Sequence, residues 1–309
     1  MSEPATAPPS PPAPPPRRRR WRWYVRLAVL AVAIGYPLIV GCDSWFYHPD
    51  RKVYYRPQEF GLSAEDVHFT TADGVRLHGW FLPAQGTPRG LVVHFHGNAA
   101  NITNHVVGAV WLPPAGYHVL LFDYRGYGQS EGRITRAGTT LDGLAAVDYA
   151  LTRPEYKPGR LFAYGQSLGG AVATVVAAQR PQVRALAVEA TFESYRGIAA
   201  RHAEKLVFFR FLARPLARLL VSAGHDPGDV IGELSPRPVL VIAGGQDRIC
   251  PPELGRALYE RAREPRAWLL IDGADHYEAA EFGGHELERR IIDTFEQGAA
   301  LPLPDAAAP

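Results

Sequence analysis

The sequence predicts an α/β fold in which a doubly wound, mostly parallel sheet is covered by helices on both faces. Three observations predict it. Apolar β-type runs such as Leu91–His94, His118–Asp123 and Val239–Ala243 suit strands that are buried on both sides. Stretches with helical spacing separate these runs from about residue 52 onward. The composition is globular, because 47% of the residues are hydrophobic and 21% are charged.

The predicted domain covers residues 46–298 and opens with strands. A strand at Lys52–Arg56 is expected to precede a hairpin of Asp66–Thr71 and Val75–Leu82 around the turn dipeptide Asp73-Gly74. The further strands are expected at Leu91–His94, His118–Asp123, Leu161–Tyr164, Ala185–Glu189, Val239–Ala243 and Ala267–Ile271. The helices are expected at Asn104–Leu112, Thr139–Leu151, Leu168–Gln179, Glu253–Arg263 and Glu286–Glu296.

Residues of about 194–233 interrupt this alternation of strands and helices. Leu206–Leu220 is rich in Phe, Leu and Arg, and three arginines stand four residues apart, at Arg210, Arg214 and Arg218. This spacing would stack them on one helical face, although Pro215 is expected to break the run. The segment is interpreted as a small helical lid with an apolar side for acyl chains or lipid. The alternative is an ordinary amphipathic helix packed on the sheet.

The N-terminal 42 residues are interpreted as a targeting segment and not as part of the folded domain. Residues 1–23 form a disordered leader, since Met1–Pro16 holds eight prolines and a run of four arginines follows. Residues 24–42 are a membrane anchor or a lipoprotein signal, because Leu27–Gly41 is uncharged and apolar. The positive flank should stay in the cytoplasm, which places the catalytic domain on the non-cytoplasmic, periplasmic or extracellular side. Residues 299–309 are expected to be a disordered tail.

Two alternatives to an uncleaved anchor stay open. Ile39-Val40-Gly41-Cys42 resembles a bacterial lipobox, in which Cys42 would be lipidated after cleavage. A buried core helix is the other alternative, and the basic flank argues against it.

Charge and cysteine content exclude several classes of function. The net charge is +2, but residues 1–26 alone contribute +5, so the rest of the chain is mildly acidic and nucleic-acid binding is not expected. The only cysteines, Cys42 and Cys250, form no disulfide framework and no zinc motif. His94 and His96 lack a third ligand and are interpreted as residues that shape a loop. No metal is therefore expected.

The sequence Gly165-Gln166-Ser167-Leu168-Gly169 predicts an activated serine. It follows the strand ending at Tyr164 and opens the helix of small residues, so the chain must turn through a tight corner. The two glycines leave room for that corner, and Ser167 lies at the helix N-terminus, where negative charge is favoured. The alternative is a glycine-rich turn that fits the pattern by chance.

A serine hydroxyl needs a base, and the base needs an orienting acid. Asp247 follows the strand Val239–Ala243, and His276 lies on the loop after the last strand, so both belong at strand ends. Their rivals are Asp272 and Asp275, which are interpreted as turn residues, and the histidines at positions 225 and 285. Cys250 has no setting that would lower its pKa and is expected to be inert.

The oxyanion of an acyl-transfer intermediate needs hydrogen-bond donors. The backbone N–H of Leu168, just after the serine, is the first candidate. The second is the backbone N–H of Asn98, because Gly97 allows the loop after Leu91–His94 to turn its amides inward. A simple Gly-Asn turn is the alternative.

Three segments carry a resemblance to a known family: His96-Gly97-Asn98-Ala99, Asp123–Gly132 (DYRGYGQSEG) and Tyr164–Gly170 (YGQSLGG). With Asp247 and His276, the chain resembles the α/β-hydrolases, specifically a membrane-anchored serine hydrolase branch that includes acyl-protein thioesterase-like hydrolases. The resemblance covers about residues 50–290.

The resemblance implies a catalytic triad of Ser167, Asp247 and His276 that hydrolyses carboxylic esters or thioesters through an acyl-enzyme, without a cofactor. It implies that Asp123–Gly132 is a supporting loop beside the site. The expected partners are an acylated small molecule, lipid or acyl-protein substrate and, through the N-terminal segment, a membrane. Two other functions stay open: an aminopeptidase of the same fold, and a non-catalytic membrane scaffold.

Overall fold

The structure is a computed structural model that describes residues 21–27, 29, 46–206 and 210–303. The chain divides into two units, Met1–Gly41 and Cys42–Pro309. In the first unit, residues 21–27 are helical and exposed. Within the described residues, no helix combines the length and the hydropathy needed to cross a membrane. Residues 1–20, most of the expected anchor, Cys42 and residues 304–309 lie outside the described residues.

An eight-stranded sheet forms the centre of the second unit, in the order β10-β9-β8-β7-β4-β6-β3-β2. All neighbouring pairs are parallel except those of β3, which runs against both β2 and β6. The strands are β2 (Glu65–Thr70), β3 (Arg76–Leu82), β4 (Gly90–Phe95), β6 (Tyr117–Phe122), β7 (Leu161–Gln166), β8 (Val183–Glu189), β9 (Val239–Gly244) and β10 (Arg266–Ile271).

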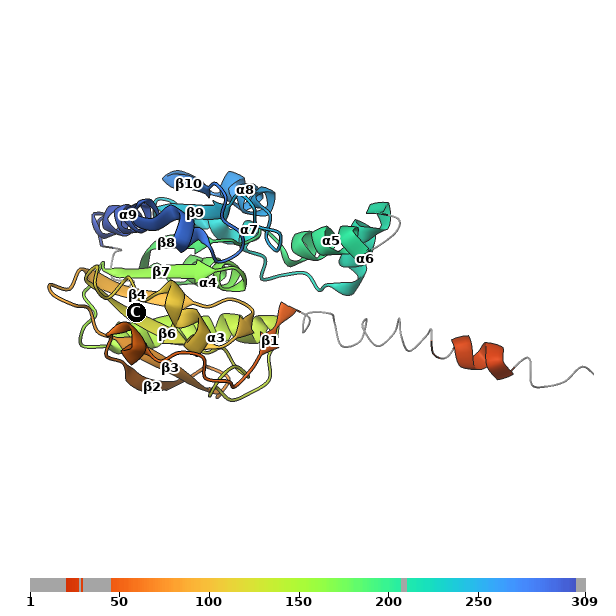
Figure 1. The fold of residues 1–309 in the computed structure, drawn as a ribbon, viewed down its shortest axis with the longest axis horizontal. Helices are drawn as coiled ribbons and strands as arrows, with labels where there is room; N and C mark the ends of the chain where they lie inside the picture. The colour runs from red at the N-terminus through yellow and green to blue at the C-terminus, as the bar shows by residue number, and fades with distance from the viewer. Residues whose placement is uncertain (1–20, 28, 30–45, 207–209, 304–309) are drawn as a thin grey trace, which may run out of the picture. The chain divides into compact units, whose positions relative to one another are not determined.

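Helices cover both faces of this sheet (Figure 1). Successive residues of β4 show the alternation: Leu91 and Val93 pack into one core, and Val92 packs into the other. The first core also holds residues of α3 (Arg136–Thr152), α4 (Leu168–Gln179) and α8 (Pro252–Arg261). The second holds residues of α2 (Ile102–His105) and α9 (Ala279–Ala299). The predicted fold class is confirmed.

One expected strand is wrong. Lys52–Arg56 forms no strand, because the Tyr54 and Tyr55 N–H groups donate to Thr103 Oγ1 and O at 3.0 and 3.2 Å. The chain is thus tied to the start of α2 and not to the sheet. The pairing just before it is a short parallel bridge between β1 (His48–Pro49) and β5 (Ala99–Ala100).

The helix expected at Asn104–Leu112 is also wrong in its bounds. The observed α2 starts two residues earlier, because Asn101 caps it through a bond from Thr103 N to Asn101 Oδ1 of 2.9 Å. It continues only as the 3₁₀ helix η3 (Val106–Gly108) and then as turns. Gly108 has low helix propensity, and Pro113-Pro114 cannot extend a helix.

Residues 194–233 divide into two parts. α5 (Tyr195–Leu206) and α6 (Ala213–Leu220) pack side by side, with η4 (Arg210–Leu212) before α6 (Figure 1). α7 (Pro227–Val230) and η5 (Ile231–Leu234) pack against α4, and Ile231 is fully buried. Only the α5–α6 pair therefore stands apart from the layers around the sheet.

Pro215 lies near the start of α6 and does not break it. At the third helical position its missing N–H removes no intrahelical hydrogen bond. Arg210 lies in η4 and not in α6, so the three arginines do not share one helix, and the break that was expected at Pro215 comes before α6. Arg214 and Arg218 remain on α6, and both are exposed.

Candidate active site

Ser167 lies at the corner between β7 and α4, in a strained conformation with φ 54° and ψ −120°. The corner depends on its two glycines. A side chain on Gly165 would overlap the backbone of Gly169, and one on Gly169 would overlap the Phe95 carbonyl oxygen. The Ser167 N–H donates to Glu189 O of the neighbouring β8 at 2.8 Å, which fixes the corner to the sheet.

The structure brings Ser167, His276 and Asp247 into one hydrogen-bonded chain. His276 Nε2 lies 3.1 Å from Ser167 Oγ, and His276 Nδ1 lies 2.7 Å from Asp247 Oδ2. An Nδ1–H that donates to the carboxylate leaves Nε2 free to accept the serine proton. The side chains of His276 and Asp247 are 5% and 0% exposed, so water competes little for these bonds.

The other candidates for the acid and the base lie away from Ser167 or stabilise the loops that carry Asp247 and His276. Asp275 Oδ1 accepts the N–H groups of Arg248 and His276, and these bonds lower the pKa of its carboxyl group. His285 is exposed beside Glu288 on α9. His225 lies beside Thr140 of α3.

Cys250 serves as a support for the triad. Its backbone N–H donates to Asp247 Oδ1 at 2.8 Å. Burial raises the pKa of its thiol, so a thiolate nucleophile is disfavoured here.

Both predicted oxyanion donors lie beside Ser167. Leu168 begins α4 directly after Ser167, and Asn98 lines the same cavity as Ser167. The Asn98 carbonyl, which belongs to the following peptide, accepts from His48 N at 2.8 Å and from Tyr127 Oη at 2.7 Å. Across the described part of the chain, neither the Asn98 nor the Leu168 N–H donates to another residue. The two amides are thus available to a ligand oxygen.

The Asp123–Gly132 loop supports the Asn98 loop. The buried Asp123 Oδ1 accepts the Ile102 N–H at 2.8 Å, at the start of α2. Tyr124 Oη donates to His96 O at 3.3 Å, and Tyr127 Oη donates to Asn98 O. Sequence reasoning gave Tyr127 no individual role. Its place inside the quoted motif is the only signal that could have pointed to it.

The histidines of this region are buried and neutral. Burial lowers the pKa of His94 to about 3 and that of His105 to about 4. His96 Nδ1 lies 2.7 Å from Gly97 O, within the loop that precedes Asn98. No group of three His, Cys, Asp or Glu residues that could hold a metal is found in the described ranges.

An apolar cavity of about 590 Å³ opens onto Ser167. Asn98 and Leu168 line it at the reactive end, together with His48. Residues of the α5–α6 pair form most of the remaining wall, and none of the described lining residues is a carboxylate. The lining side chains from α5, α6 and their flanks are Ile198, Ala199, His202, Ala203, Leu216, Ala217, Leu220 and Val221.

Comparisons with known proteins agree with this geometry. The chain is 35% identical to the uncharacterized protein YfhR of Escherichia coli O157:H7, over 84% of this chain and 88% of that protein. The sequence pattern of the family described as "Serine aminopeptidase, S33", Hydrolase_4, matches residues 86–235. The chain belongs to the α/β-hydrolase superfamily.

Solved structures give the same fold. The hydrolase superposes on the Pyrococcus furiosus esterase Pf2001 with a TM-score of 0.66 at 23% identity, covering 82% of this chain and 98% of the esterase. Acetyl xylan esterase 1 from Thermoanaerobacterium gives a TM-score of 0.57 at 20% identity, covering 80% and 86%. At such identities these similarities show the fold alone.

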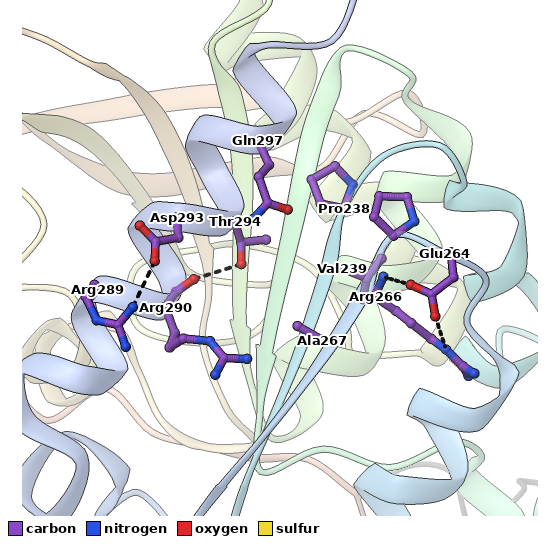
Figure 2. A pocket seen from close by; sticks show the side chains of 11 residues that line it. Pro238, Val239, Glu264, Arg266, Ala267, Arg289, Arg290, Asp293, Thr294 and Gln297 are labelled. Atoms are coloured by element: carbon purple, nitrogen blue, oxygen red, sulfur yellow. Dashed lines mark hydrogen bonds and ion pairs between the residues drawn. The ribbon is translucent and has the colours of Figure 1, made fainter.

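A second cavity of the hydrolase, of about 420 Å³, is shown in Figure 2. It lies at the amino ends of β9 and β10, whereas Ser167 follows the carboxyl end of β7. Four of its charged side chains are paired, Arg289 with Asp293 at 3.2 Å and Arg266 with Glu264 at 3.3 Å, and Arg290 donates to Trp268 O at 3.4 Å. The Thr294 hydroxyl of this cavity donates to Arg290 O at 2.8 Å, and no histidine among the described lining residues could act as its base, so the cavity is not a candidate for the chemistry at Ser167.

Proposed function

We propose that this α/β-hydrolase is a serine hydrolase that cleaves carboxylic esters or thioesters through an acyl-enzyme. The observation that carries the proposal is the chain from Ser167 Oγ through His276 to Asp247 at the end of an apolar cavity. Ligands in α/β folds bind at the carboxyl ends of the strands, which is where this cavity lies.

The reaction follows from the geometry. Ser167 Oγ attacks the acyl carbonyl carbon while His276 Nε2 takes the hydroxyl proton, and Asp247 stabilises the resulting imidazolium. The carbonyl oxygen becomes an oxyanion that accepts from the N–H groups of Asn98 and Leu168. His276 then returns its proton to the departing alcohol or thiol. Water, activated by the same imidazole, hydrolyses the acyl-enzyme and restores Ser167.

The cavity favours an acyl chain as the recognised part of the substrate. Its wall is built from aliphatic side chains of α5 and α6, so an apolar chain entering it would leave water. An acylated small molecule, a lipid or an acylated protein would each present such a chain. The choice between ester and thioester depends on the leaving group, which lies outside this wall.

An aminopeptidase is the second candidate, because the matching family is described as a serine aminopeptidase. A free substrate amine is a cation and needs a carboxylate partner. The described residues that line the cavity beside Ser167 offer none, so the ester or thioester function ranks higher. Comparing an aminoacyl p-nitroanilide with a p-nitrophenyl ester of similar size separates the two, and preference for the anilide would reverse the ranking.

The membrane attachment expected from the N-terminal segment remains a proposal, with the catalytic domain on the non-cytoplasmic side. The outer side of the α5–α6 pair supports it. Phe211 and Leu219 are 74% and 58% exposed, and Arg214 and Arg218 beside them could meet anionic headgroups. Recovery of full-length protein in the membrane pellet after carbonate washing tests the attachment, and recovery in the supernatant would contradict it.

The decisive test is Ser167→Ala. We expect this variant to lose labelling by a fluorophosphonate probe and turnover of short p-nitrophenyl esters, because it removes the hydroxyl that lies 3.1 Å from His276 Nε2. Retained turnover would refute the assignment of Ser167. A wild-type protein that takes up no probe would instead support a non-catalytic scaffold.

A further inference from the structure

Tyr277 follows His276 directly and has an uncommon backbone conformation. Its φ is +65°, in the left-handed region that residues other than glycine rarely adopt. This conformation turns its ring back over the site, with ring centroids 4.2 Å from His276 and 5.6 Å from His105. Such strained residues gather at functional sites, where the surrounding structure holds them in place.

The Tyr277 hydroxyl fills the space where Gly97 has no side chain. A methyl group on Gly97 would overlap the Tyr277 hydroxyl oxygen. Gly97 immediately precedes Asn98, whose N–H is the second oxyanion donor proposed above. The absence of a side chain at Gly97 thus provides the space that the Tyr277 hydroxyl occupies.

The same hydroxyl lies close to Ser167. Burial raises the pKa of Tyr277, and the interaction between its hydroxyl and that of Ser167 lowers this pKa by less. The net effect keeps Tyr277 a neutral phenol, which has one O–H to donate. The hydroxyl therefore stands between the nucleophile and the Asn98 loop, although 39% of the residue's surface is exposed.

We propose that the Tyr277 hydroxyl is a third donor to the oxyanion, beside the N–H groups of Asn98 and Leu168. This inference rests on the proposed function of Ser167. When Ser167 Oγ bonds to the acyl carbon, the carbonyl π electrons move to the oxygen, and Tyr277 donates its O–H to that oxygen. No proton leaves Tyr277, and the hydrogen bond weakens when the carbonyl re-forms and the leaving group departs.

The test is Tyr277→Phe in the full chain, which removes only the hydroxyl. We expect kcat for a p-nitrophenyl ester to fall by about 10²-fold, with KM little changed, because the bond forms in the transition state. The affinity for a trifluoromethyl ketone, which mimics the tetrahedral adduct, should fall by a similar factor. The pH dependence of kcat/KM should stay unchanged, because His276 and Asp247 are untouched.

Tyr259→Phe is the matched control, because Tyr259 lies on α8 and packs against Trp268 of β10, and it does not line the cavity at Ser167. Its kcat should equal that of the wild type, and thermal unfolding of both variants checks that each is folded. An unchanged kcat in Tyr277→Phe would overturn this inference alone. A raised kcat would also overturn it, since the hydroxyl would then occupy the oxyanion position. Absence of fluorophosphonate labelling in the wild type would overturn the proposed function and this inference together.

Discussion

The Asp247 carboxylate is held from two directions. Its Oδ1 accepts the N–H groups of Ile249 and Cys250, each at 2.8 Å, and its Oδ2 accepts from His276. The backbone bonds fix the carboxylate, so it can orient the imidazole without a rearrangement during catalysis. This loop geometry suits Asp247 to the proposed role of orienting acid, whereas Asp275 holds the backbone of His276.

Asp247→Asn should therefore lower kcat for ester hydrolysis by about 10⁴-fold, because an amide NH₂ facing Nδ1 favours the wrong imidazole tautomer. Thermal unfolding should change little, since the Asn oxygen can still accept the two backbone N–H groups. Steady-state kinetics measure the loss. Asp272→Asn, at an exposed rival on the loop of His276, is the control and should keep full activity. Equal losses in both variants would contradict the assignment of Asp247.

At the scale of elements, α5 and α6 determine what can reach Ser167. Ala217 lies on the buried side of α6, at 5% exposure, and lines the cavity with Leu216 and Leu220. Small and branched aliphatic side chains at these positions leave the volume open to an apolar chain. The α5–α6 pair thus forms a wall of the cavity beside Ser167, whereas α7 and η5 of the same segment belong to the packed layer around α4.

Ala217→Phe should shorten the acyl chain that the enzyme accepts. The larger ring would fill part of the cavity, so kcat/KM for a long-chain p-nitrophenyl ester should fall at least about 10-fold, while the acetate ester reacts as before. A series of esters of increasing chain length measures the change. Ala223→Phe, at an exposed site just after α6, should leave the series unaltered. An equal fall for acetate and long-chain esters would argue against an acyl-binding wall.

At the scale of the whole molecule, the buried histidines behind the Asn98 loop link stability to pH. His105 has a folded-state pKa of about 4, below the 6.5 of the unfolded chain. Between these values the unfolded state binds a proton that the folded state does not, so the free energy of unfolding falls as the pH falls. The loss begins near pH 6.5 and levels off below about pH 4.

His105→Gln should remove one such contribution. As the pH falls from 6 to 4.5, the free energy of unfolding of the wild type should decrease by up to about 1.4 kcal/mol more per pH unit than that of the variant. Urea unfolding at a series of pH values measures this difference. His285→Gln, at an exposed histidine, should keep the wild-type slope. If the free energy of unfolding of His105→Gln and that of the wild type changed equally with pH, His105 would not be a source of the pH dependence.

Much of the fold was predictable because its signals are local. Buried runs such as Val239–Ala243 are apolar throughout since both faces are covered, and Asp73-Gly74 marks its hairpin by turn chemistry alone. The prediction of a strand at Lys52–Arg56 was wrong because the N–H groups of Tyr54 and Tyr55 donate to Thr103, which is 49 residues from Tyr54 in the chain. No local pattern encodes such a partner.

The sequence by itself determined the chemistry available to this protein: a serine at a strand-to-helix corner, and an acid and an imidazole after later strands of a parallel sheet. Tertiary structure decided which groups meet. Ser167 and His276 are 109 positions apart, and crossover helices bring them to within hydrogen-bond distance at one edge of the sheet. It also decided the cavity wall and the place of the Tyr277 hydroxyl, because packing between distant segments fixes distances that residue spacing leaves open.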